Sequence, residues 1–197
     1  MIRLAAFRHA PTEWNRAKRL QGRRDVPLDA AGRDWLAGQR LPPDLAGFDW
    51  FTSPLARARE TAERLGVTAR PDDRLIEMDW GRWEGRSLAD LRAEDPDGIA
   101  AAEVRGLDLT PPGGESPRAV IARLRPLLAE LAAAGRDCGF VTHKGVLRAL
   151  LAEATGWPLL GRAPLRLERE TILLFRLGPD RLDLEGSLHL TPREPPP

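Results

Sequence analysis

The stretch IRLAAFRH at residues 2–9 decides the fold prediction: a short apolar run that ends in an arginine and a histidine. Residues 2–7 of this stretch predict a buried strand. The stretch CGFVTH at residues 138–143 has the same form and also ends in a histidine. Ligands of open α/β sheets bind beyond the carboxyl ends of the strands. If these two strands are neighbours, His9 and His143 face each other across one crevice.

Further strand and helix signals alternate along the chain. This alternation predicts an α/β fold, a three-layer sandwich with a mostly parallel central sheet and helices on both faces. The helix signals are serine or aspartate caps, prolines at first helical positions and apolar stripes. The expected helices span 29–40, 54–65, 117–134 and 145–155, and the further expected strands span 48–52, 171–177 and 181–188.

The segment from about 77 to 116 lacks this alternation. It contains Trp80 and Trp83, a short helix that begins after Ser87, and a Pro-Pro-Gly-Gly turn at residues 111–114. We expect an inserted subregion that covers the sheet edge and acts as a substrate lid. The length of 197 residues predicts a single catalytic domain over residues 1–190, and proline-rich residues 191–197 predict a disordered tail.

Composition excludes several classes of protein. Thirty basic residues against twenty-nine acidic ones argue against nucleic-acid coating or polybasic membrane binding, so neither partner is expected. A single cysteine, Cys138, excludes a disulfide framework and a four-cysteine zinc site. The sequence has no spaced metal-ligand motif, Walker loop or dinucleotide fingerprint, so we expect no metal and no cofactor. It also has no signal peptide or apolar stretch of about 20 residues, which predicts a cytoplasmic protein.

The two strand-end histidines are the strongest functional signal. A helix begins just after His143, and its free N–H groups and positive dipole end favour an anion in the crevice. The alternative is that the two histidines are unrelated polar residues at loop starts. Their shared context favours function. His189 lies beyond the two expected strands 171–177 and 181–188, which form a predicted hairpin, and receives no role.

Several motifs now match one family in order. RHAPTEWN at residues 8–15 resembles the R-H-G-x-T-x-W-N opening of the histidine phosphatase superfamily, the phosphoglycerate-mutase-like clan. LQGR at 20–23 and SPLARARETA at 53–62 resemble its next loop and its arginine-bearing helix. LIE at 75–77 with GRWEG at 81–85 resembles its acid-bearing loop, and VTH at 141–143 with GVLR at 145–148 its second histidine block. PGGES at 112–116 resembles a motif of the small phosphatase branch.

The resemblance implies a catalytic set. His9 attacks phosphorus and becomes a phosphohistidine, with its other ring nitrogen held by an acceptor such as a backbone carbonyl. Arg8 and Arg57 clamp the phosphoryl oxygens, and His143 completes the cationic pocket. Glu77 protonates the leaving oxygen and then activates water.

The phosphate-binding residues implied by the resemblance also include neutral donors, at Asn15, Gln21 and Gly22. Two of the assignments have competitors in the sequence itself. Spacing alone would place Arg57 on a solvated helix face, and Glu84 competes with Glu77 for the role of acid.

Three positions depart from the family pattern. Ala10 replaces a glycine and is tolerated if its backbone avoids positive φ. Pro11 stands at a commonly acidic position and removes an N–H. Lys144 stands where many relatives carry glycine. If it points inward it adds a cation suited to a second acidic group on the substrate, and if it points outward it is a solvated lysine.

The sequence therefore predicts a metal-independent phosphomonoesterase that acts on a small phosphorylated metabolite through a phosphohistidine. Two alternatives stay open: phosphoryl transfer of the phosphoglycerate mutase type, and a non-catalytic phosphoester-binding module. The complete catalytic set weighs against the binding module, because binding alone does not require Glu77. Which metabolite is the substrate, and whether the chain is a monomer or a homodimer, are not predicted.

Overall fold

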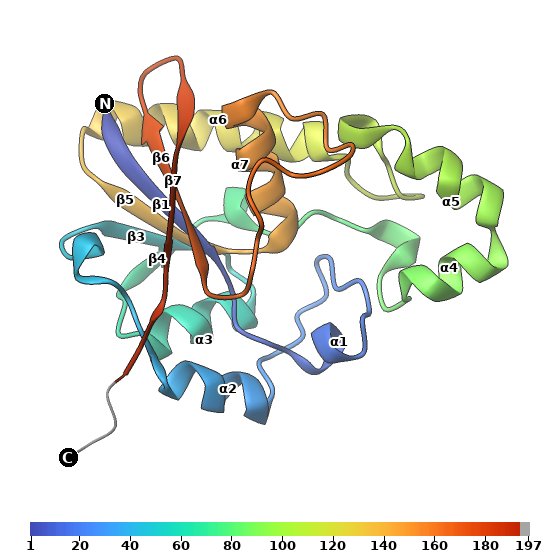
Figure 1. Cartoon of the computed structure of the whole chain (residues 1–197), viewed down its shortest axis with the longest axis horizontal. Helices are drawn as coiled ribbons and strands as arrows, with labels where there is room; N and C mark the ends of the chain where they lie inside the picture. The colour runs from blue at the N-terminus through green and yellow to red at the C-terminus, as the bar shows by residue number, and fades with distance from the viewer. Residues whose placement is uncertain (194–197) are drawn as a thin grey trace.

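The computed structural model describes residues 1–193 and is built around a six-stranded sheet of order β4-β3-β5-β1-β6-β7 (Figure 1). Strands β4, β3, β5 and β1 are mutually parallel, while β6 runs antiparallel to β1 and β7 antiparallel to β6. The mostly parallel sheet is therefore confirmed. The strands are β1 (Ile2–Arg8), β3 (Asp49–Thr52), β4 (Ala69–Pro71), β5 (Cys138–Thr142), β6 (Thr171–Leu177) and β7 (Leu182–His189).

Helices cover both faces of the sheet, as the alternation predicts. Successive side chains of a strand point to opposite faces, so Leu4 and Ala6 of β1 join one apolar cluster while Ala5 and Phe7 join another. The first cluster includes α6 (Pro117–Ala134) and α7 (Lys144–Thr155), and the second includes α2 (Ala30–Ala37) and α3 (Ala56–Arg64). In Figure 1, α6 runs along the top and α7 stands to the right of the strands, while α2 and α3 lie below them.

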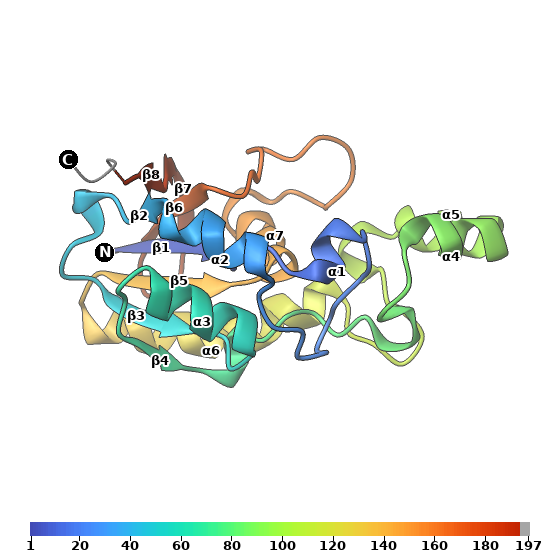
Figure 2. The same cartoon turned by 90° about the horizontal axis from the view of Figure 1, so that it is seen from below.

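The segment between Glu77 and Ser116 forms a lobe with α4 (Leu88–Glu94) and α5 (Pro96–Glu103). Ser87 caps α4 by accepting a hydrogen bond from Asp90 N. The lobe does not cover a sheet edge, so that expectation is wrong. Figures 1 and 2 show it projecting at the end of the molecule opposite the N-terminus. Its base is held there because Leu20 N, in the segment before α2, donates a hydrogen bond to Arg86 O at 2.9 Å.

Two predicted helices have different bounds. The helix expected from Pro54 begins at Ala56, because the Ser53 hydroxyl is not a helix cap and contacts His143 instead. The helix capped by Asp29 ends at Ala37, because residues Gln39–Arg40 form β2.

Strand β2 pairs with β8 (Thr191–Pro192). The predicted disordered tail is therefore wrong for Thr191 and Pro192, and residues 194–197 lie outside the described part of the chain. The sequence did not predict α1 (Glu13–Arg16) or the short edge strand β4. None of the helices within residues 1–193 is long and apolar enough to cross a membrane. Short 3-10 turns occur at Pro43–Leu45, Asp73–Leu75, Gly81–Trp83 and Gly106–Asp108.

Candidate active site

The two predicted histidines lie side by side at the carboxyl ends of neighbouring parallel strands. β1 and β5 are in register with Arg8 opposite Thr142, and His9 N donates to Thr142 O at 2.8 Å. The centres of the His9 and His143 rings are 5.2 Å apart. Both side chains are buried. The crevice expected from the sequence is therefore present, and the backbone of the central sheet fixes it.

His9 is held with one ring nitrogen free. Its Nδ1 lies 2.6 Å from Ala10 O, a carbonyl that can only accept, so Nδ1 carries the proton and Nε2 keeps its lone pair. Burial, reinforced by Arg8 and Arg57, lowers the pKa of His9 well below its usual 6.5. A neutral imidazole with a free Nε2 is the form that can attack phosphorus. Ala10 does not have positive φ, which is the condition for tolerating it.

His143 is oriented by Ser53, which follows β3. Leu55 N donates to Ser53 Oγ at 3.3 Å, and Ser53 Oγ lies 2.7 Å from His143 Nε2. Within residues 1–193 the hydroxyl has no acceptor other than Nε2, so we assign its proton to that contact, which places the ring proton of neutral His143 on Nδ1. This Nδ1 is buried and has no hydrogen-bond partner within residues 1–193.

Arg8 and Arg57 supply two further unpartnered donors. Arg57 is fully buried, so the solvated-face alternative is wrong. Its Nη1 donates to Arg24 O at 2.7 Å and its Nη2 to Gly22 O at 2.8 Å, which fixes the guanidinium plane. In the described chain, the buried Nε of Arg57 and the buried Nε of Arg8 have no partner. Buried donors are nearly always satisfied, so unpaired ones beside a cavity indicate an anion site.

Glu77 is the acid that faces this site. Met78 N donates to its Oε1 at 2.8 Å, and Gly145 N donates to its Oε2 at 3.3 Å. A Cβ on Gly145 would lie 2.4 Å from Glu77 Oε1, so glycine there permits the close approach. Burial raises the pKa of the Glu77 carboxyl above its usual 4.5 despite these hydrogen bonds. A raised pKa favours the protonated form that a general acid needs.

The competing glutamate has a structural role. Glu84 Oε1 accepts a hydrogen bond from Arg23 N at 2.7 Å, and Glu84 Oε2 lies 3.6 Å from Arg24 Nε. Both contacts hold the loop whose carbonyl groups orient Arg57. Glu84 is absent from the cavity lining, whereas Glu77 belongs to it.

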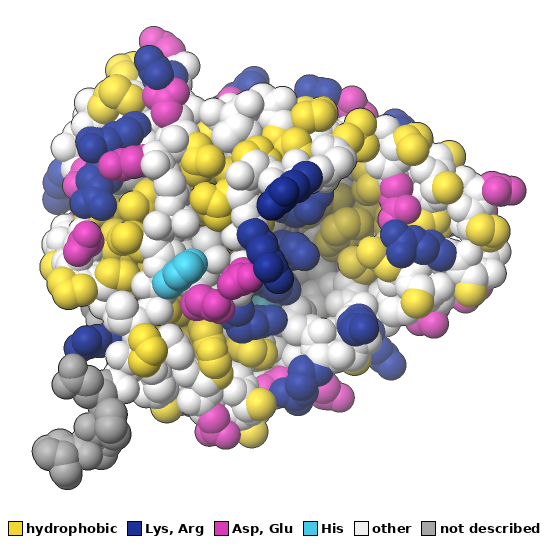
Figure 3. All heavy atoms as spheres, viewed as in Figure 1, with side chains coloured by type: hydrophobic (Ala, Val, Ile, Leu, Met, Phe, Trp, Pro, Cys, Tyr) yellow, Lys and Arg dark blue, Asp and Glu magenta, His cyan; other side chains and the backbone are white. Residues whose placement is uncertain are grey.

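The cavity between the sheet and the lobe has a volume of about 430 Å³. Figure 3 shows it as a hollow with Lys and Arg side chains gathered on its left rim and hydrophobic side chains within it and on its right. Predicted residues Asn15, Gln21 and Lys144 line it, the last with its side chain exposed to solvent. Gly22 does not line the cavity. The other lining residues are Arg8, His9, Arg19, Leu20, Arg57, Glu77, Met78, Trp80, Leu88, Glu103, Gly106, Leu109, Pro117, Gly145, Arg148 and Leu159.

Sequence reasoning missed Ser53 as the partner of His143 and Arg148 as a cavity residue. The local sequence of Ser53 is that of a helix cap. Arg148 is part of the GVLR motif, and the sequence assigns it no role of its own. The sequence also gave no sign that Arg169, just before β6, lies close to Arg8. Burial, together with the charge of Arg8, lowers the pKa of the Arg169 guanidinium to about 10. The signal for Ser53 is its position at the end of a strand that neighbours β5.

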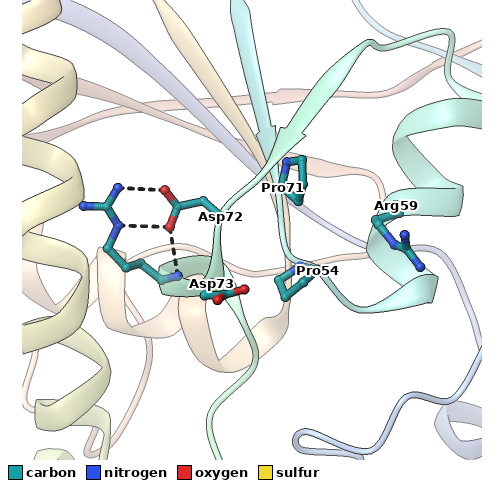
Figure 4. A pocket seen from close by; sticks show the side chains of 6 residues that line it. Pro54, Arg59, Pro71, Asp72 and Asp73 are labelled. Carbon is teal, nitrogen blue, oxygen red and sulfur yellow. Dashed lines mark hydrogen bonds and ion pairs between the residues drawn. The ribbon is translucent and has the colours of Figure 1, made fainter.

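A second hollow of about 570 Å³ lies near the amino end of α3. Figure 4 shows that the side chain of Asp72 there is bonded to the neighbouring Arg74, while Arg59 points away from it. Neither histidine of the pair lines this hollow. Within residues 1–193, no group of three His, Cys, Asp or Glu side chains could hold a metal ion.

Comparison with known proteins agrees with this geometry. The family model of the histidine phosphatase superfamily (branch 1) matches residues 4–186, and the chain belongs to this superfamily. Glucosyl-3-phosphoglycerate phosphatase from Mycobacterium tuberculosis is 35% identical over 184 residues, 81% of this chain and 80% of that protein. A probable phosphoglycerate mutase from Klebsiella pneumoniae is 34% identical over 182 residues, 87% of this chain and 83% of that protein. The crystal structure of TTHB049 from Thermus thermophilus aligns with a TM-score of 0.76 at 32% identity, covering 96% of this chain and 100% of that one.

Proposed function

We propose that the chain is a metal-independent phosphomonoesterase that hydrolyses a small phosphorylated metabolite through a phosphohistidine on His9. The observation that carries the proposal is a set of three buried nitrogens without partners in the described chain: Arg8 Nε, Arg57 Nε and His143 Nδ1. Arg8 and Arg57 line the cavity together with His9, and the His143 ring lies beside the His9 ring, so these nitrogens can serve as donors for phosphoryl oxygens. Unpaired buried donors destabilise a protein, so a bound phosphoryl group explains why the fold keeps them.

The first step forms a bond between His9 Nε2 and phosphorus and breaks the bond between phosphorus and the ester oxygen. The leaving oxygen takes the proton of the Glu77 carboxyl, so the alcohol departs neutral. The two arginines and His143 Nδ1–H stabilise the charge on the transferring group. Arg57 is well suited to this role because its bonds to two loop carbonyls fix the guanidinium before substrate binds.

The second step returns the enzyme to its starting state. Glu77, now a carboxylate, takes a proton from water as the water oxygen attacks phosphorus. The bond between phosphorus and His9 Nε2 breaks, and inorganic phosphate leaves. One carboxyl thus serves as acid and then as base, which its raised pKa supports.

The test is phosphate release from an aryl phosphate by the wild-type chain and by His9→Ala, both in excess EDTA. We expect wild-type turnover that is lost in the variant, and a radiolabelled phosphoryl group on the wild-type protein after acid-free quenching. Activity that survives His9→Ala would show that another group is the nucleophile. Loss of wild-type activity in EDTA would overturn metal independence.

The same assay separates the two alternatives. A phosphoglycerate mutase would accept the label on His9 and return it to a phosphoglycerate with little release of phosphate. A binding module would bind phosphate esters without labelling or release. We expect release to exceed return to any added acceptor, because Glu77 lines the cavity in a position to activate water.

A further inference from the structure

The cavity holds more positive charge than one phosphoryl group requires. Besides Arg8 and Arg57 it is lined by Arg19, Lys144 and Arg148. In the part of the chain that the structure describes, none of these five side chains forms an ion pair with a carboxylate. Many other arginines in the molecule do so, for example Arg74, Arg118 and Arg125. The cavity cations are therefore available to a ligand.

Lys144 and Arg148 are the most informative of these residues because their positive charges are electrostatically unfavourable at these positions of α7. They stand four positions apart at the start of α7, so they share one helix face, where like charges repel. Lys144 is also the first residue of the helix, where the dipole disfavours a cation. Partial burial, followed by the charges of Arg8 and Arg148, lowers the pKa of Lys144.

Trp157 holds the guanidinium of Arg148 over its ring, with Arg148 Cζ 4.8 Å from the ring centre. This contact orients the side chain without neutralising its charge. Burial lowers the pKa of Arg148. An arginine stacked in this way keeps its N–H donors free for a planar or tetrahedral anion.

The opposite wall carries one cation, Arg19, whose backbone pairs with Ser87 of the lobe. The lobe contributes Trp80, Leu88 and Leu109, which are apolar, and Glu103, which is engaged by Arg92. The α7 side, with Lys144 and Arg148, therefore carries more positive charge than the lobe side, where Arg19 is the one cation in the cavity lining.

We propose that the substrate carries a second anionic group, a carboxylate or a second phosphate, and that Lys144 and Arg148 bind it while Arg8 and Arg57 hold the phosphoryl group. This subsite defines the substrate class as phosphate monoesters with two separated anionic groups. It rests on the proposed phosphomonoesterase function, because it assumes that the reacting phosphoryl group occupies the His9 end of the cavity.

The test measures binding, so that it does not depend on turnover. The probes are benzylphosphonates, which cannot be hydrolysed, carrying at the meta or para position a carboxylate, the neutral carboxamide of the same shape, or a second phosphonate. Calorimetry gives the Kd of each for wild type, Lys144→Gln, Arg148→Gln and the double variant. Arg59→Gln is the matched control, since it removes one exposed positive charge from α3, away from the cavity.

For wild type we expect the carboxylate or the bisphosphonate to bind about ten- to hundredfold more tightly than the carboxamide. Which of the two binds better identifies the second group. The preference should fall several-fold in each single variant and approach one in the double variant, while Arg59→Gln and Lys144→Arg keep it. Equal Kd values for charged and neutral probes in wild type, or a preference that survives the double variant, would overturn the subsite. Failure of every probe to bind would overturn it too.

Turnover of the matching aryl phosphates is measured in parallel and judges the proposed function separately. Selective binding without phosphate release would leave the subsite standing and refute the phosphomonoesterase. Phosphate release without selective binding would support the phosphomonoesterase and refute the subsite.

Discussion

The two ends of the cavity are built in different ways. The phosphate end is fixed by backbone: His9 N bonds to β5, the Glu77 carboxylate accepts two backbone N–H groups, and Arg57 donates to two carbonyls. The distal end is made of half-buried side chains from the lobe and α7, together with the exposed Lys144. We define the phosphate end as Arg8, His9, Arg57, Glu77 and His143, and the distal end as Trp80, Leu88, Leu109, Lys144 and Arg148.

This difference separates chemistry from recognition. Groups held by a central sheet keep their geometry before the substrate arrives, which is what transition-state stabilisation requires. Groups on an inserted lobe and a helix face can change without disturbing the sheet. We therefore expect changes at the phosphate end to reduce kcat, and changes at the distal end to raise KM.

The largest effect should come from Glu77→Gln. Loss of a general acid and base should reduce kcat by about 10²- to 10⁴-fold for an alkyl phosphate. The loss should be smaller for 4-nitrophenyl phosphate, whose leaving group departs without a proton. Glu84→Gln is the control, because the Glu84 carboxylate holds the neighbouring loop. We expect this variant to lose unfolding free energy and to show a much smaller loss of kcat than Glu77→Gln. Equal losses of kcat in the two variants would contradict the assignment of the acid.

The pH dependence of kcat/KM, in wild type and in Glu77→Gln, tests the same assignment. Catalysis needs neutral His9 and protonated Glu77. Burial lowers the first pKa below 6.5 and raises the second above 4.5. Wild-type kcat/KM should therefore rise as pH increases through the pKa of His9 and fall as pH passes that of Glu77. In Glu77→Gln the fall at higher pH should vanish while the rise at lower pH stays, as a pH series from acidic to alkaline buffers would show.

Arg57→Lys should cost about 10²- to 10³-fold in kcat, the usual effect of losing a donor to a transition-state anion. Lysine keeps the charge but cannot donate to Gly22 O, Arg24 O and a phosphoryl oxygen in one plane. Two carbonyls would lose their partner, so we also expect a loss of about 1–3 kcal/mol in unfolding free energy. Kinetics and chemical denaturation measure the two effects. Arg59→Lys, on the exposed face of the same helix, should change neither.

Sequence predicted the phosphate end well because its residues follow strands. His9 and His143 each come directly after a buried apolar run, and parallel strands bring such positions to one edge of the sheet. The family motifs then singled out Arg57, whose helix spacing alone predicted solvent exposure. The structure shows the opposite, because the loop at residues 22–24 folds over its guanidinium.

The distal end was harder to predict because no periodic pattern encodes it. The lobe was expected over a sheet edge, but its position depends on single contacts such as Gly85 N donating to Leu20 O at 2.7 Å. Arg148 lies on an ordinary amphipathic helix, and its contact with the Trp157 ring is tertiary packing that the local sequence does not encode. Ser53 was missed for a related reason, since its local sequence is that of a helix cap and its partner is 90 positions away.

Ser53→Ala tests how far the backbone-fixed end depends on this one side chain. Without the hydroxyl, nothing directs the proton of His143 to Nδ1, so we expect kcat to fall about tenfold with little change in KM. Nitrogen NMR of the ring should show a mixture of tautomers. Ser116→Ala also removes a hydroxyl acceptor, from Ala119 N at the start of α6, and should cost about 1 kcal/mol of stability without changing kcat. An unchanged kcat with altered tautomers would show that His143 does not donate to the transferring group.

The smallest effect should come from Gly81→Ala, at the base of the lobe. Gly81 has φ of +51°, and a Cβ there would lie 2.4 Å from Pro112 O. The lobe joins the rest of the molecule here, and we call the two facing segments, residues 80–82 and 112–114, the neck. The neck must widen to accept the methyl group, which would displace Trp80 beside it. We expect KM to rise a few-fold, kcat to hold, and stability to fall by about 1–3 kcal/mol.

Gly113→Ala separates backbone strain from the displaced neck. Gly113 belongs to the same neck and has φ of +74°, but a Cβ there would meet nothing within 4 Å. It should therefore lose about 1 kcal/mol from the positive φ alone, with KM unchanged. The difference between the two variants measures the contribution of lobe position to substrate affinity. A rise in KM for both would tie affinity to flexibility of the neck. A fall in kcat for Gly81→Ala would mean that the lobe also positions the phosphate end, and the division between the two ends would then fail.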